Sequence, residues 1–164
     1  MVSKSKWLGG KKAQSNGKQF EQVLIKYCHQ ENIAVKKIDP AFHQVGNKIW
    51  RSQSGCDFIL GYKSIAVFVD AKSIDSDRIS YSFLKPHQIA DLKYWGNSGF
   101  TSGLIVWFRK SNVISFIHID ELLKLNPGES IKDHETIQLG TYYNFNLVRL
   151  FTWRRDFPQL PIPK

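Results

Sequence analysis

The chain has 164 residues, of which 42% are hydrophobic, including eleven phenylalanines and five tryptophans. This length and composition fit one globular domain with a substantial core and exclude a disordered chain. The 23 Lys and Arg residues outnumber the 14 Asp and Glu residues and give a formal net charge of +9. Such a charge on a small protein favours a polyanionic partner or an anionic membrane surface.

No segment has the features of a membrane span or a signal peptide. The uncharged apolar runs, such as residues 65–69 and 104–108, are far shorter than the ~20 residues that a spanning helix needs. Residues 1–18 contain no apolar core of the kind found in signal peptides, so we expect a cytoplasmic protein without membrane association. Cys28 and Cys56 lack metal-ligand spacing, so we expect two buried thiols rather than a disulfide or zinc site.

The N-terminal third is expected to hold a flexible arm, a helix and a short strand. Residues 1–16 are rich in Lys, Ser and Gly and lack apolar periodicity, which predicts a flexible basic arm. A helix is then expected from a cap at Ser15 or Asn16, because apolar residues recur with helical spacing at Phe20, Val23, Leu24 and Tyr27. Residues 33–38 alternate as a strand does, and Asp39-Pro40 ends it.

The rest of the chain alternates between hairpins and helices. Residues 39–54 form a long, mildly basic connector without a clear pattern, and loops of this length are often functional. A hairpin at 55–73 is followed by a helix from Pro86 to about Gly96, a second hairpin around Ser111-Asn112, and a short helix after Asp120. Residues 126–164 are ambiguous. The order predicts a single α/β or α+β domain over residues 17–164, built around a mixed sheet.

The hairpin at 55–73 reads GCDFILGYKSIAVFVDAKS and contains three charged residues on apolar strands. Residues two apart face the same way in a strand, so Asp70 and Lys72 share one face. A two-residue turn at Tyr62-Lys63 would put Asp57 opposite Phe68, diagonal to Asp70 and on that same face. A three-residue turn would put Asp57 on the other face.

Two converging carboxylates and a lysine suit metal-assisted phosphodiester hydrolysis. Hard oxygen ligands favour Mg²⁺, with Mn²⁺ able to substitute, and a metal ion offsets the repulsion between Asp57 and Asp70. Lys72 is positioned to orient a water molecule or to neutralise charge on a phosphate. The alternative is a cross-strand salt bridge on a solvated face, with no catalytic role.

An acid followed, about a dozen residues later, by DAK resembles the D…(D/E)xK signature of the restriction-endonuclease-like nuclease superfamily. Within it, GKQFEQVLIKYC (17–28) is similar to the first helix of RecU-type Holliday junction resolvases, and SGCDFILGYKSIAVFVDAKS (54–73) to their catalytic hairpin. FLKPHQIADLKYW (83–95) is similar to the following helix, and later strands and a helix extend the resemblance over residues 17–125. The resemblance implies an α/β fold with a restriction-endonuclease-like core, a mixed sheet flanked by helices.

The resemblance also implies a role for each matching residue. Asp57 and Asp70 would bind the metal ion, Lys72 would assist the attacking water, Glu21 would support the metal site, and Gln88 would position the active site or the scissile phosphate. Three features depart from the family. Asp70 stands where the family usually has Glu, and residues 39–54 look shorter than the stalk-like insertion that projects into the centre of the junction. The residues after Leu125 also match the family poorly.

The basic residues suggest how DNA would be held. Phosphate contacts give affinity with little sequence information, and the candidates in the arm and connector are Lys4, Lys6, Lys11, Lys12, Lys18, Lys48 and Arg51, with Lys36 and Lys37 nearby. We therefore expect a metal-dependent, structure-selective endonuclease that resolves four-way DNA junctions by paired cuts as a homodimer. The alternatives are another endonuclease of the superfamily, acting on duplex or branched DNA, and a non-catalytic DNA-binding module on this fold.

Overall fold

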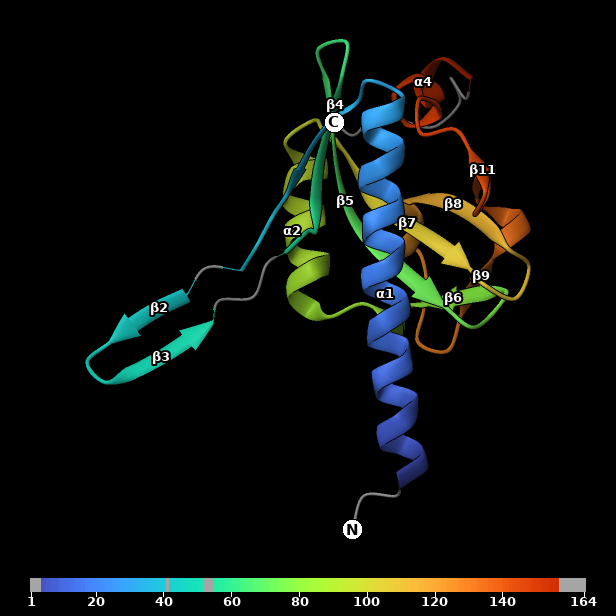
Figure 1. Cartoon of the computed structure of the whole chain (residues 1–164). Coiled ribbons are helices and arrows are strands. Elements are labelled where there is room, and N and C mark those ends of the chain that lie inside the picture. Colours follow the sequence, from blue (N-terminus) through green and yellow to red (C-terminus); the bar gives the residue numbers. More distant parts are fainter. Residues whose placement is uncertain (1–3, 41, 52–54, 157–164) are drawn as a thin grey trace.

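A seven-stranded mixed sheet forms the centre of the molecule in a computed structural model, which describes residues 4–40, 42–51 and 55–156 (Figure 1). Its strands lie in the order β1 (Ala34–Lys37), β4 (Phe58–Tyr62), β5 (Ile65–Ile74), β7 (Thr101–Phe108), β8 (Val113–His118), β10 (Ile137–Thr141) and β11 (Asn144–Phe145). Only β5 and β7 are paired in parallel within this sheet, and α2 connects them. The architecture confirms the predicted α/β fold with a mixed sheet flanked by helices.

Helices cover both faces of the sheet. The helical elements are α1 (Lys4–Gln30), α2 (Pro86–Asn97), α3 (Ile119–Leu123), α4 (Arg149–Asp156), and the 3₁₀ turns η1 (Tyr81–Phe83) and η2 (Asp133–Glu135). Two small antiparallel pairs stand outside the main sheet, β2 (Phe42–Val45) with β3 (Lys48–Arg51) and β6 (Arg78–Ser80) with β9 (Ser130–Lys132). Among the described residues, no helix is long and apolar enough to cross a membrane.

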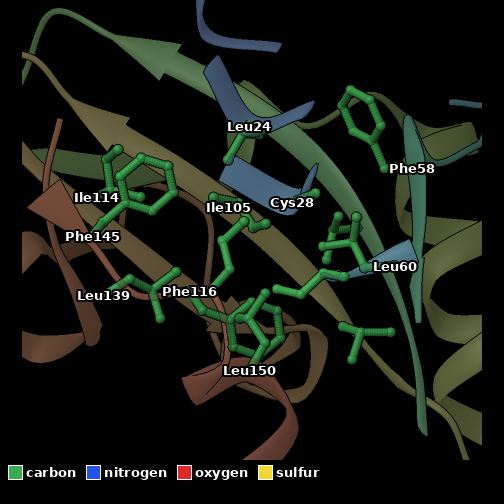
Figure 2. Packing of buried hydrophobic residues seen from close by; sticks show 14 of the residues in the cluster. Leu24, Cys28, Phe58, Leu60, Ile105, Ile114, Phe116, Leu139, Phe145 and Leu150 are labelled. Atoms are coloured by element: carbon green, nitrogen blue, oxygen red, sulfur yellow. The ribbon is translucent and has the colours of Figure 1, made fainter. Parts of the chain in front are cut away.

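The alternation along β5 divides the core into two clusters. Val67 and Val69 pack with α1 residues such as Leu24 and with Leu150 of α4, in the cluster shown in Figure 2. Phe68 faces the other way, toward Leu92 of α2 and the cluster that α2 and α3 cover. Since Asp70 and Lys72 follow Phe68 at two-residue steps, both lie on the α2 face of the sheet.

The first helix is longer than the sequence predicts. Its expected start near Ser15 or Asn16 is wrong, because α1 begins at Lys4 and takes up residues 4–16 of the predicted arm. Lys, Gln, Ala and Leu are good helix formers, and the helix extends from turns already packed on the sheet through Phe20 and Leu24. Figure 1 shows its N-terminal turns running past the edge of the sheet.

The hairpin turn lies one residue later than predicted. Tyr62 pairs with Ile65, and the two turn residues, Lys63 and Ser64, have φ angles of 47° and 65°. Positive φ at both positions is the geometry of a type I′ turn, which matches the twist of the two strands. The predicted register is therefore wrong by two residues. A shift of two keeps every side chain on its face, so the placement of Asp57 and Asp70 on one face is unaffected.

The connector at 39–54 is more regular than expected. Its described residues form the β2–β3 hairpin, which turns at Gly46-Asn47 and projects away from the rest of the domain (Figure 1). The side chains of Val45 and Ile49 near the turn are 69% and 70% exposed. Residues 41 and 52–54 lie outside the described part of the chain.

Candidate active site

The candidate site lies where α2 begins and where β5 carries Asp70 and Lys72. Pro86 is the first residue of α2, and Gln88, at the third position, turns its side chain onto β5. Proline suits this position because its missing N–H would have no partner in the first turn. Asp70 is fully buried between strand and helix, and Gln88 is nearly so.

Asp70, Lys72 and Gln88 form a closed set of contacts. Gln88 Nε2 donates to Asp70 Oδ1 at 2.6 Å. Lys72 Nζ lies 2.8 Å from Asp70 Oδ2 as an ion pair and donates to Gln88 Oε1 at 3.1 Å. Each of the three side chains therefore fixes the other two, and the lysine head is held beside the buried carboxylate.

Asp57 joins this set from the start of β4. Its backbone N–H donates to the carbonyl of Val69 at 3.0 Å, and its carbonyl accepts from Ile38 N at 2.8 Å. Its carboxylate Oδ2 accepts from the backbone N–H of Ala71 at 2.9 Å. The Asp57 side chain thus adds a hydrogen bond between the strands beyond Phe58 and Val69, the last regular pair of β4 and β5, and it lies next to Asp70.

The pKa of Asp70 reports how these charges act on one another. The pKa of the Asp70 carboxyl is raised from 3.8 to about 7 by burial first and by the charge of Asp57 second, while the charge of Lys72 and its hydrogen bond oppose the rise. Burial is the largest cause, because a carboxylate loses its hydration in a poorly solvated site. A cation bound between Asp57 and Asp70 would remove this penalty.

The donor set fits a small divalent cation. Asp70 Oδ2 is buried, and apart from its ion pair with Lys72 it accepts no hydrogen bond from the described residues, so it retains a lone pair that could bind a metal ion. No group of three His, Cys, Asp or Glu side chains suited to metal binding occurs among the described residues. Two carboxylates suffice for Mg²⁺, which usually keeps several waters and binds one or two carboxylates together with substrate phosphates.

Glu21 lies apart from the four residues that the structure brings together. It sits on α1, which covers the opposite face of the sheet, and its carboxylate accepts from Lys37 Nζ at 2.6 Å. The hydrogen bond that Lys37 donates to Glu21 is the main reason why the pKa of Lys37 is raised, and the charge of Asp57 adds to the rise. Lys37 thus links Glu21 to the site electrostatically.

The sequence does not predict that Lys37 lies near the site and instead places it with the DNA-binding residues. It pairs with Phe58 in the β1–β4 ladder, so it lies one residue away from Asp57 across the sheet. The closeness of Lys37 to Asp57 follows from the register between β1 and β4, which the sequence pattern does not give.

The DNA-binding residues predicted in the arm and the connector lie on two elements. Lys18 is exposed on α1, and Lys48 is exposed at the start of β3 in the projecting hairpin. Lys4, Lys6, Lys11 and Lys12 belong to α1, and Arg51 ends β3, but the side chains of these five residues lie outside the described part of the structure. The structure therefore separates the basic residues between a long helix and a hairpin.

Comparison with known proteins gives a family and a related fold. The model of the RecU family, described as Recombination protein U, matches residues 14–145. A solved structure of Hjc, a Holliday junction resolvase from the archaeal hyperthermophile Archaeoglobus fulgidus, is similar with a TM-score of 0.53 at 13% sequence identity. That similarity covers 74% of this chain and 95% of Hjc and concerns the fold. No curated protein matches the chain.

Proposed function

Because the chain belongs to the RecU family of Holliday junction resolvases, we propose that it cuts four-way DNA junctions by Mg²⁺-dependent phosphodiester hydrolysis at Asp57, Asp70 and Lys72. Membership of this nuclease family implies a divalent metal and a junction substrate, while the choice of Mg²⁺ and of these residues is our proposal. The observation that carries it is the buried Asp70, held by Gln88 and Lys72 and facing Asp57.

Each residue of the site has a defined task in this mechanism. Asp57 and Asp70 would hold the ion, which when bound supplies charge stabilisation for the phosphate and a more acidic water. Gln88 keeps Asp70 Oδ1 in place through its 2.6 Å hydrogen bond. Lys72 places its ammonium group where it can orient the attacking water or balance the charge that develops on the phosphate.

Glu21 is proposed as a supporting residue. Its ion pair with Lys37 fixes the lysine beside Asp57, so that Glu21 adjusts the charge around the site from the other face of the sheet. In this position it could also hold a water molecule that belongs to the outer shell of the metal ion.

The substrate suggests how the protein would work as an assembly. A four-way junction has twofold symmetry, and two cuts at symmetric positions are most simply made by a homodimer with one site in each protomer. The projecting β2–β3 hairpin would reach toward the junction centre, and the lysines of α1 and the hairpin would contact phosphates. We expect the reaction to take place in the cytoplasm.

A cleavage assay tests the proposal directly. Labelled four-way junction, linear duplex and single-stranded DNA are each incubated with the protein in Mg²⁺ or in EDTA, and the products are resolved on a denaturing gel. Symmetric, metal-dependent nicks confined to the junction are expected. Equal cutting of duplex would indicate a general endonuclease, and tight binding without cleavage would indicate a DNA-binding module.

A further inference from the structure

The residues directly before Asp57 press against the middle of α2. A side chain at Gly55 would overlap both the Cβ atom and the carboxylate of Asp91. Because the Cβ atom of Asp91 is fixed to the helix backbone, a different rotamer could not relieve the overlap. Glycine is therefore required at position 55 by the closeness of the helix.

Cys56 strengthens this contact. Its side chain is only 1% exposed, and its thiol lies within hydrogen-bonding reach of the Asp91 carboxylate. The pKa of the Cys56 thiol is raised to about 12, by burial first and by the nearby Asp91 carboxylate second. The buried Cys56 side chain therefore adds to the close contact that Gly55 makes with Asp91.

The contact between Gly55 and Asp91 lies between the projecting hairpin and Asp57. On the downstream side Asp57 is tied by hydrogen bonds to Ile38, Val69 and Ala71. On the upstream side, the chain arrives from β3, which ends at Arg51 in the projecting hairpin. A movement of the hairpin would reach Asp57 along the chain, through Gly55 and Cys56. Holding these two residues against α2 would therefore keep Asp57 in place.

One helix thus contacts both candidate metal ligands. Gln88 and Asp91 are three residues apart in α2, so their side chains point to the same side of the helix. Gln88 holds Asp70, and Asp91 holds the segment that leads into Asp57. We propose that Asp91 is a positioning residue that fixes Asp57 for metal binding by anchoring Gly55 and Cys56 to α2, an inference that rests on the proposed function.

Two variants separate the packing of Asp91 from its charge. Asp91→Ala removes the partner of the thiol and leaves space beside Cys56, so we expect a loss of metal affinity of about 10-fold to 100-fold, as for other residues that orient metal ligands. Asp91→Asn keeps the shape and an oxygen that accepts from the thiol, so it should restore affinity to within about threefold. Asn97→Ala, at the exposed end of α2, is the matched control and should leave affinity unchanged.

Gly55 provides an independent test of the contact. Gly55→Ala should reduce metal affinity more than Asp91→Ala does, because its methyl group has no room. Asp91→Gly removes the opposing Cβ atom, so the double variant Gly55→Ala with Asp91→Gly should bind metal better than Gly55→Ala alone. A double variant that binds metal more weakly than either single variant would overturn the proposed contact. Circular dichroism of each variant shows whether it is folded.

The measurements use the full-length protein and Mn²⁺ alone, with binding followed by calorimetry and the reaction of Cys56 with iodoacetamide followed by peptide mass spectrometry. In Asp91→Ala we expect weaker Mn²⁺ binding and at least 10-fold faster alkylation of Cys56, with Cys28 as the internal reference for global unfolding. Unchanged Mn²⁺ binding and unchanged alkylation would overturn the inference. Neither readout depends on DNA cleavage, so a wild-type protein that fails to cut junctions would contradict the proposed function while leaving this result interpretable.

Discussion

Lys72 Nζ lies 2.8 Å from Asp70 Oδ2 on the same face of β5, and Asp70 is fully buried. A buried ion pair of this kind is a poor source of stability, because the loss of hydration offsets much of the attraction between the two charges. Hydrophobic residues in the same space would serve the fold at least as well. We therefore attribute the pair to the proposed hydrolysis, in which a carboxylate and an ammonium group act together.

Replacing Asp70 by Asn tests that chemistry. The substitution keeps the shape of the side chain but removes a metal ligand, so junction cleavage should fall by more than about 100-fold, beyond the effect usual for residues that only support a ligand. Binding of the junction in EDTA should be retained or tightened, because a negative charge near the DNA is lost. A gel-shift titration beside the cleavage assay measures both. Asp75→Asn, on an exposed aspartate, is the control, and full cleavage by Asp70→Asn would refute the site.

The stability of the metal-free protein should depend on the protonation of Asp70. Its pKa is about 7 in the folded protein, against an ordinary value of 3.8. The folded state therefore binds this proton more tightly than the unfolded state, so the contribution is fully present below about pH 3.8 and is lost as the pH rises through 7. Urea unfolding in EDTA should thus show a greater free energy of unfolding at pH 5.5 than at pH 8.

The Asp70→Asn variant supplies the reference for this measurement. It lacks the titrating group, so the difference between its stability and that of the wild type should grow from pH 5.5 to pH 8 in favour of the variant. Parallel pH profiles for the two proteins would show that the carboxyl group does not titrate in this range. Saturating Mg²⁺ should reduce the difference, because the ion stabilises the charged form.

Gln88→Ala removes the hydrogen bond to Asp70 Oδ1 and the acceptor for Lys72. We expect the Mg²⁺ concentration for half-maximal cleavage to rise about 10-fold to 100-fold, the usual effect of losing a residue that orients a metal ligand. Junction affinity in EDTA should change by less than about twofold, because Gln88 is almost fully buried. A titration of cleavage rate against Mg²⁺ measures the effect. A lower maximal rate at an unchanged half-maximal concentration would assign Gln88 to substrate contacts instead.

Glu21→Gln separates the electrostatic role of the Glu21–Lys37 pair from its contribution to the fold. Lys37 is 45% exposed, so the pair contributes at most about 1 kcal/mol to stability. Cleavage should nevertheless fall, by about 10-fold, because the loss of the Glu21 charge weakens the contact that holds Lys37 near Asp57. Thermal unfolding and cleavage rates are compared for Glu21→Gln and for Glu31→Gln, an exposed residue just beyond α1. Equal rates for the two variants would limit Glu21 to a surface ion pair.

The convergence of Asp57, Asp70 and Lys72 was predicted from the period of two along β5, and the place of Gln88 from the resemblance to RecU-type resolvases. The catalytic roles of all four residues stay a prediction. The register was not predictable, because a type I′ turn normally shows Asn-Gly or Asp-Gly and here uses Lys63 and Ser64. The wrong register still gave the correct face, since the error was two residues.

The remaining differences concern information that no local pattern contains. The start of α1 depends on the packing of its later turns, which extends the helix into a lysine-rich segment without apolar periodicity. The place of Lys37 depends on the pairing of β1 with β4. The contact between Gly55 and Asp91 depends on how closely α2 approaches the sheet. Each is a tertiary relationship between segments far apart in the chain.

The β2–β3 hairpin offers a test of junction selectivity. Val45 and Ile49 lie near its turn and are 69% and 70% exposed, so replacing both by Ser should change the free energy of unfolding by less than about 0.5 kcal/mol per residue. If these apolar side chains contact unstacked bases at the junction centre, the ratio of junction affinity to duplex affinity should fall about 10-fold, equivalent to ~1.4 kcal/mol. Competition gel shifts at fixed salt measure this ratio.

Lys48→Ala in the same hairpin is the matched comparison, because it removes a charge rather than an apolar contact. Its loss should weaken junction and duplex binding by a similar factor and reduce the slope of log affinity against log salt by about 1, as expected for one phosphate contact. The Val45 and Ile49 double variant should leave that slope unchanged. An unchanged affinity ratio in the double variant would show that junction selectivity arises outside the hairpin tip.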